Sequence, residues 1–136
     1  MNWTLEVVVV PVSDVDRAMA FYAGQLGFNV DHDTGTGPAR FAQLTPPGSG
    51  CSIVVGTSLV EMEPGSLQGL QLVVSDLRAA RAQLVANGVE VGEIQVLGPQ
   101  GARPAAEEDD LNNVGFVFFA DPDGNRWAVQ QITARG

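Results

Sequence analysis

Runs of β-branched and apolar residues alternate along the chain with segments of helical spacing, and this alternation predicts a mixed fold of strands and helices. The first strand is expected over residues 4–11, because proline is tolerated only at a strand end or edge. A helix follows, since Ser13 or Asp14 can accept hydrogen bonds from the free N–H groups of a first turn. Its apolar residues recur at helical spacing until Gly27. Three more strands are expected over residues 28–32, 40–45 and 51–55.

The second half of the chain predicts the same order of elements after a small, polar connector. A strand is expected over residues 67–74, and a helix follows from residue 75 until Asn87-Gly88 stops it. Further along, the pattern predicts a strand over residues 89–97, a long loop over 98–113 and a hairpin over 114–132. The turn of that hairpin is Asp-Pro-Asp-Gly-Asn at 121–125, whose residues favour tight turn geometry.

The two halves are an internal repeat. Val-Ser-Asp at 12–14 ends the first strand and opens a helix, and Val-Ser-Asp at 74–76 does the same about 62 residues later. Each half is too small to bury its own sheet, so the two must cooperate. We therefore predict one domain over residues 1–136, with module 1 at about 1–56, a connector at 57–66 and module 2 at about 67–136.

Composition and charge narrow the partners and the compartment. With 45% apolar and 17% charged residues, the 136-residue chain has ordinary globular composition. It shows neither a long apolar span nor a signal peptide, and its one cysteine, Cys51, excludes an internal disulfide, so we expect a cytoplasmic protein. A net charge of −9 argues against nucleic acid or an anionic membrane as the partner.

Several motifs resemble the vicinal oxygen chelate superfamily, which includes glyoxalase I, bleomycin-resistance proteins and extradiol dioxygenases. They are Val-Ser-Asp-Val-Asp-Arg-Ala at 12–18, Phe21-Tyr22, Leu-Gly-Phe at 26–28, Val-Ser-Asp-Leu at 74–77 and Asp-Pro-Asp-Gly-Asn at 121–125. The resemblance implies an α+β fold of two βαβββ modules that form a curled open barrel with helices outside, and it implies a homodimer. An unrelated ferredoxin-like or other α+β domain is the alternative.

The same resemblance locates the positions where metal-binding members carry a ligand, one on each of four strands. Those positions hold Val7, Gly69, Ala128 and, within one residue of register, Val54, and none of these side chains can ligate a metal. The sole histidine, His32, is expected at the surface. We therefore predict no metal site and no cofactor.

The resemblance implies that Val7, Gly69 and Ala128 face a cavity, and alternation along the strands extends this face to other side chains, because residues two apart lie on the same face. The predicted face is apolar with a few amides, which suits an uncharged, partly aromatic small molecule. One of the two phenylalanines at 116 and 118 is expected in this lining, whereas Trp127 is expected to point away into the core. The predicted ligand-binding residues are Val7, Phe41, Gln43, Ser52, Val54, Gln71, Phe116, Phe118, Arg126 and Gln130.

Two charged features have alternative interpretations. Arg126 can clamp a carboxylate or phosphate, or it can be exposed to solvent or paired with an acid such as Asp123. The loop at 98–113 is long enough to be a lid, and its acids at 107–110 are either solvated or available for proton transfer.

Two functions from different classes follow, and a third is weaker. The first is a metal-independent binding protein that sequesters a largely apolar or aromatic ligand. The second is a metal-free isomerase, cyclase or lyase that acts on a natural-product-like or carbonyl substrate by acid/base catalysis. The third is a dimeric scaffold with a collapsed pocket.

Overall fold

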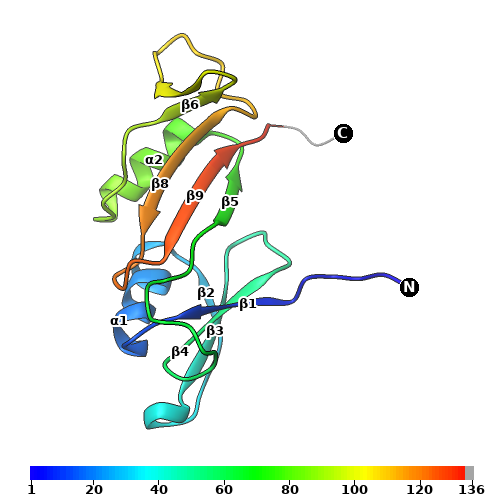
Figure 1. Cartoon of the computed structure of the whole chain (residues 1–136), viewed down its shortest axis with the longest axis vertical. Helices are drawn as coiled ribbons and strands as arrows, with labels where there is room; N and C mark the ends of the chain where they lie inside the picture. The colour runs from blue at the N-terminus through cyan, green and yellow to red at the C-terminus, as the bar shows by residue number, and fades with distance from the viewer. Residues whose placement is uncertain (134–136) are drawn as a thin grey trace. The chain divides into compact units, whose positions relative to one another are not determined.

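The computed structural model describes residues 1–133, which form two compact units (Figure 1). The first unit comprises Met1–Leu67 and the turn Asp121–Asn125. The second comprises Gln68–Ala120 and the chain from Arg126 on. Each unit has a small, open, twisted sheet with helical structure, so the fold is α+β as predicted.

The first unit follows the predicted βαβββ order. Strand β1 (Val7–Pro11) leads into helix α1 (Val15–Met19), which continues as a π-helical segment η1 (Ala20–Gln25). The remaining elements are β2 (Asn29–Thr34), the short 3-10 helix η2 (Gly37–Ala39), β3 (Phe41–Thr45) and β4 (Ser52–Gly56). The sheet order is β1-β4-β3-β2, with β1 parallel to β4.

The core of the first unit lies between one face of this sheet and the helix. Val10, Leu44 and Val55 are fully buried on the sheet, and Ala18 and Tyr22 are buried on the helical segment. Asp14 is the N-cap, and its side chain accepts a hydrogen bond from the backbone N–H of Arg17, which satisfies one free donor of the first turn. The buried residues of the helical segment are among the apolar residues whose helical spacing predicted it.

The second unit repeats this plan with one addition. Strand β5 (Leu70–Val74) leads into α2 (Leu77–Ala86), which Asp76 caps as Asp14 caps α1. The other strands are β6 (Gln95–Gly98), β7 (Gly101–Pro104), β8 (Gly115–Ala120) and β9 (Arg126–Gln131). Their order, β5-β9-β8-β6-β7, matches that of the first sheet apart from the extra edge strand β7.

The extra strand corrects two predictions. The predicted strand over 89–97 begins only at Gln95, and Val91 makes an isolated bridge to Phe119. The predicted loop over 98–113 contains β7, since Gly98 and Gly101 pair and close a tight hairpin. Glycine and proline around this turn look like loop punctuation in sequence, and the four residues of β7 are all exposed, so no alternation announces a strand.

Two other strand boundaries also differ from the prediction. The first strand begins at Val7 rather than at residue 4, and β2 runs over Asn29–Thr34 rather than 28–32. Every residue of β2 is exposed, and its pairing with β3 shifts between Val30 and His32. A charged edge strand with such an irregularity resists pairing with another chain.

The turn Asp121–Asn125 is held by a buried hydrogen-bond network within the first unit. Asp121 Oδ1 accepts from the backbone N–H groups of residues 123, 124 and 125 at 2.9–3.0 Å. Its Oδ2 accepts from Tyr22 Oη at 2.7 Å and from Asn125 Nδ2 at 2.8 Å. Asn125, which is fully buried, also donates to the Pro11 carbonyl and accepts from the Leu67 N–H. The residue types that favour a tight turn at 121–125 and the buried hydrogen bonds of Asp121 and Asn125 therefore favour the same turn conformation.

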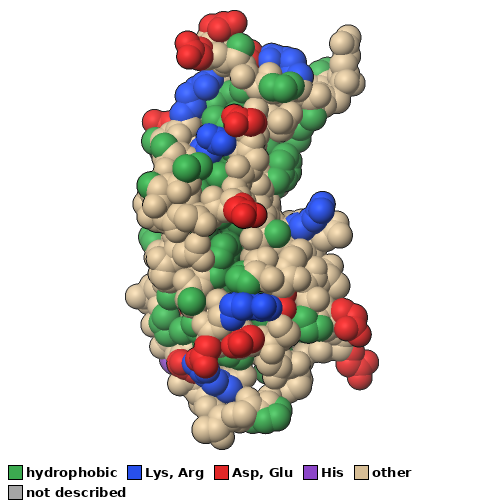
Figure 2. All heavy atoms as spheres, turned by 90° about the vertical axis from the view of Figure 1, so that its left-hand side faces the viewer, with side chains coloured by type: hydrophobic (Ala, Val, Ile, Leu, Met, Phe, Trp, Pro, Cys, Tyr) green, Lys and Arg blue, Asp and Glu red, His purple; other side chains and the backbone are tan. Residues whose placement is uncertain are grey.

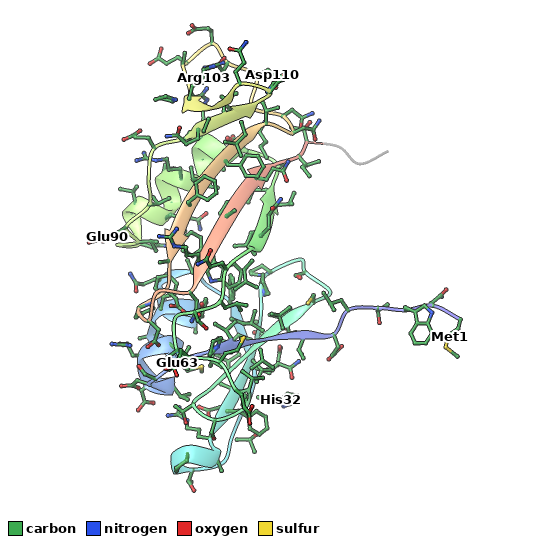
Figure 3. All side chains as sticks on the ribbon, in the orientation of Figure 1. Met1, His32, Glu63, Glu90, Arg103 and Asp110 are labelled. Atoms are coloured by element: carbon green, nitrogen blue, oxygen red, sulfur yellow. The ribbon has the colours of Figure 1, made fainter. Side chains whose placement is uncertain are left out.

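We expect Asp121→Ala to lower the free energy of unfolding by about 3 kcal/mol, because it leaves buried donors on Tyr22 and Asn125 unsatisfied. Urea denaturation followed by circular dichroism measures this loss. The control is Glu90→Ala at an exposed position (Figure 3), which we expect to change stability by less than about 0.5 kcal/mol. Equal denaturation midpoints for the two variants would contradict the role given to the network.

Candidate functional site

The face of the second sheet opposite α2 gathers all five predicted ligand-binding residues of module 2. Gln71, Ala128 and Phe118 are register partners across β5, β9 and β8. The next row consists of Val73, Gln130 and Phe116. We call these two rows, together with Arg126 on the same face of β9, the aromatic face.

Exposure distinguishes the two sides of this sheet. On the aromatic face, Phe118 is 45% exposed and Val73 is 41% exposed. On the other side, Trp127 is 3% exposed and stacks on Phe119 with ring centroids 6.0 Å apart. The prediction that Trp127 belongs to the core is confirmed. Apolar side chains left this open on a sheet face are typical of a binding surface.

Both phenylalanines lie on the aromatic face, whereas only one was expected in the lining. Their rings are nearly parallel, with an interplanar angle of 7° and centroids 6.2 Å apart. A flat ring placed against them can gain stacking contacts beyond the burial of its area.

Two hollows adjoin Phe118. One has a volume of about 230 Å³ and is lined by residues 68–71 together with Phe118, Arg126, Trp127 and Ala128. The other has a volume of about 290 Å³ and is lined by residues 118–120 with Arg126 and Trp127. Phe118, Arg126 and Trp127 border both hollows, and of these three residues Phe118 and Arg126 are exposed on the aromatic face.

The amide groups of the aromatic face are ordered by one another. Gln71 Nε2 donates to Gln130 Oε1, and Gln130 Nε2 donates to the Asn113 carbonyl at 2.8 Å. Sequence reasoning did not single out Asn113. Its backbone is left-handed, with φ at 68°, a conformation in which asparagine is enriched among non-glycine residues. Fixed amides of this kind can orient a polar substituent of a ligand.

Of the alternatives for Arg126, the structure excludes pairing with Asp123 and agrees with an exposed side chain. The Asp123 carboxylate instead accepts hydrogen bonds from the Ser13 hydroxyl at 2.6 Å and from Arg17 Nη2 at 2.9 Å, both within the first unit. The turn network fixes Asp123 beside the start of α1, where its carboxylate forms an ion pair with Arg17. Within residues 1–133, Arg126 makes no hydrogen bond or ion pair with another residue.

The predicted residues of module 1 share a face of the first sheet. Val7 lies level with Ser52, and Gln43 lies level with Val54, while Phe41 is two residues from Gln43 on the same strand. These five side chains point away from the helix-covered core, and all except the buried Ser52 are partly exposed. Their role in binding stays a prediction.

On this face of the first sheet, the Ser52 hydroxyl is already hydrogen-bonded within the first unit. Ser52 Oγ lies 2.6 Å from Thr45 Oγ1, and Thr45 donates to Asp31. The hydrogen bond from Thr45 is the main cause that lowers the pKa of the Asp31 carboxyl. Ser52 therefore has a protein partner, which distinguishes it from the open residues of the aromatic face.

The four strand positions that metal-binding proteins of the resembled type use for ligands carry apolar side chains or none. Val7, Val54, Gly69 and Ala128 have no donor atom beyond the backbone. Across residues 1–133, histidine, cysteine, aspartate and glutamate form no group of three or more that can hold a metal ion. His32 is exposed on β2, as expected.

Comparison with known proteins decides the family. The sequence model of the Glyoxalase/Bleomycin resistance protein/Dioxygenase superfamily matches residues 4–129. The chain belongs to this superfamily. No curated protein sequence matches it.

Solved structures of this superfamily resemble the chain over nearly its whole length. TnmS3, an antibiotic binding protein from Streptomyces sp. CB03234, is 31% identical, with 96% of this chain and 97% of TnmS3 covered and a TM-score of 0.75. A glyoxalase/bleomycin resistance protein from the same organism is 32% identical, with coverages of 94% and 100% and a TM-score of 0.72. A superfamily member from Sphaerobacter thermophilus DSM 20745 is 26% identical, with coverages of 96% and 98% and a TM-score of 0.74.

One residue of this chain's acidic segment at 107–110, Asp109, is held by hydrogen bonds. Asp109 accepts two hydrogen bonds from Arg103 at 2.9 Å each and one from the Ala106 N–H at 2.7 Å (Figure 3 labels Arg103 and, in the same segment, Asp110). These contacts hold the pKa of the Asp109 carboxyl far below its usual range, chiefly through the bond from Arg103. Asp109 is therefore unsuited to be a general base near neutral pH. Among residues 1–133, no helix is long and apolar enough to span a membrane.

We expect Asp109→Asn to reduce the hydrogen-exchange protection of the backbone around Ala106 at neutral pH, because the variant loses the charged bidentate pair. The folded pKa is lowered, so the stabilisation is fully present above the ordinary carboxyl pKa of 3.8 and is lost as pH falls through the lowered value. The difference between the two proteins should therefore shrink below about pH 4. Protection factors measured by mass spectrometry test this, with Glu108→Gln as the control. A difference that does not depend on pH would contradict the ionic explanation.

Proposed function

We propose that this protein binds and sequesters a largely apolar or aromatic small molecule on the aromatic face, without a metal ion. One observation carries the proposal: two parallel phenylalanine rings lie on an open sheet face, and Phe118 remains 45% exposed. Covering such rings with a flat ligand removes apolar surface from water and adds stacking worth about 0.5–1.5 kcal/mol per ring pair.

The relatives support a binding role. TnmS3 is described as an antibiotic binding protein, and it resembles this chain over almost the full length of both. Since fold alone does not determine function, the proposal depends on the aromatic face and uses TnmS3 only to suggest a natural-product type of ligand. The glutamines at 71 and 130 then supply orientation, because their amides are fixed by each other and by the Asn113 carbonyl.

Metal independence belongs to the same proposal and is supported by the side chains at the ligand positions. A catalytic divalent ion needs nitrogen, oxygen or thiolate donors, and Gly69 and Ala128 provide none. The alternative, a metal-free isomerase, cyclase or lyase, gains no specific support. Its proton-transfer group would come from the acids at 107–110, and Asp109 there is held as an anion by Arg103.

Assembly and location are further parts of the proposal. We infer a homodimer, supported by apolar side chains left uncovered near the N-terminus, where Trp3 is 88% exposed and Leu5 is 69% exposed. Analytical ultracentrifugation measures the assembly directly. We also propose a cytoplasmic protein without a nucleic-acid partner, in keeping with the net charge of −9.

We expect the neutral fluorescent aromatic N-phenyl-1-naphthylamine to bind the protein, and Phe118→Ala to weaken this binding about three- to tenfold through lost stacking and burial. Fluorescence titration measures both affinities. Val85→Ala is the matched control, since Val85 is also an exposed apolar residue, 51% exposed on α2 at the other side of the sheet. Equal weakening by both variants would show that the dye does not use the aromatic face.

Two further measurements on the same protein test metal independence and sequestration. Affinity should be unchanged after treatment with EDTA, and small molecules that copurify with the protein should be recovered chemically intact. A loss of affinity with EDTA would overturn metal independence. Conversion of a bound compound, observed by mass spectrometry, would favour the enzyme instead.

A further inference from the structure

The chain contains arginine but no lysine, and nearly every arginine within residues 1–133 forms a hydrogen bond or an ion pair with another residue. All seven basic residues are arginines, set against sixteen acids. Within residues 1–133, three of them form ion pairs at 2.6–2.9 Å: Arg17 with Asp123, Arg40 with Asp33 and Asp16, and Arg103 with Asp109. Acids are in excess, so such pairing is the expected outcome for an arginine in this chain.

Two arginines on α2 are also engaged. Arg81 donates to the Gly92 carbonyl at 2.9 Å and lies 3.4 Å from the Glu93 carboxylate. Arg78 donates to the Ala106 carbonyl at 2.9 Å. Figure 2 shows acidic and basic side chains interspersed on one side of the molecule rather than gathered by sign.

Arg126 is the exception within residues 1–133, since it has no hydrogen-bond or ion-pair partner there. It is exposed at the start of β9 and borders both hollows beside the Phe118 ring. Its register partner Ala120 has no polar side-chain group to pair with it. A guanidinium with free donors therefore lies at the edge of an otherwise apolar, amide-bearing surface.

We propose that the ligand of the aromatic face is an aromatic acid, whose rings stack on Phe118 and whose anionic group is bound by Arg126. This inference rests on the proposed function and adds the charge of the ligand to it. The guanidinium fork can take a carboxylate or sulfonate with two parallel hydrogen bonds, which fixes the direction of the ring as well as its charge. It also revises the uncharged ligand expected from the sequence, because Asp123, one possible partner of Arg126 in the sequence analysis, forms an ion pair with Arg17.

A pair of dyes that differ by one acidic group tests the inference. 8-Anilinonaphthalene-1-sulfonate has the ring system of N-phenyl-1-naphthylamine and adds a sulfonate. We expect the wild-type protein to prefer the sulfonate, and Arg126→Gln to weaken binding of the sulfonate about tenfold more than it weakens binding of the neutral dye. Arg81→Gln is the control, since it changes the net charge equally and lies on α2, away from the aromatic face.

The outcomes separate this inference from the proposed function. Loss of sulfonate affinity in Arg126→Gln alone, reduced further by added salt in the wild type, supports the charge contact. If both arginine variants weaken the sulfonate equally, or if the wild type does not prefer it, the inference is overturned while binding of the neutral dye still supports the proposed function. If Phe118→Ala affects neither dye, the proposed function itself fails.

Discussion

The buried carboxylate of Asp121 is the constraint on which the register of the last two strands depends. It accepts from three consecutive backbone N–H groups and from two side chains, and it is only 5% exposed. A turn held in this way cannot slide by one residue without leaving donors unsatisfied in the interior. Because side chains alternate along a strand, a one-residue slip would reverse both faces of β9. The position of Ala128 on the aromatic face and of Trp127 in the core therefore follows from a polar network several residues away.

The two units share a topology but differ in the side chains on the sheet face away from the helix. Asp14 and Asp76 cap equivalent helices, and the parallel pairs β1–β4 and β5–β9 occupy equivalent places in their sheets. The faces away from the helices differ in chemistry. In the first unit Ser52 and Thr45 bond to one another, whereas in the second unit the rings of the aromatic face remain open to solvent. The two sheets thus share a topology, and the second carries partly exposed phenylalanine rings on the face away from its helix.

Periodicity and the repeat were enough to predict the α+β class and the two helices, and the superfamily resemblance supplied the positions that fixed which strand face each residue shares. Period-two alternation is a local property, so once the resemblance had marked Gly69 and Ala128 as facing the cavity, Gln71 and Gln130 could be placed on the same face before their strands were known to pair. The strand β7 could not be predicted in this way, because four exposed residues bounded by glycine and proline show no alternation. The partner of Asp123 was also beyond sequence reasoning, since Arg17 is 106 positions away and only the folded turn brings the two together.

That distant pairing has a chemical consequence for the aromatic face. In a chain with more than twice as many acids as arginines, a nearby carboxylate would be expected to neutralise each cation. The turn network holds Asp123 against Ser13 and Arg17, so the acid closest in sequence to Arg126 is engaged elsewhere. The bonds that stabilise the turn thereby leave a charged donor free beside stacked rings. Structural bonding in one unit thus sets the charge that the other unit can offer to a ligand.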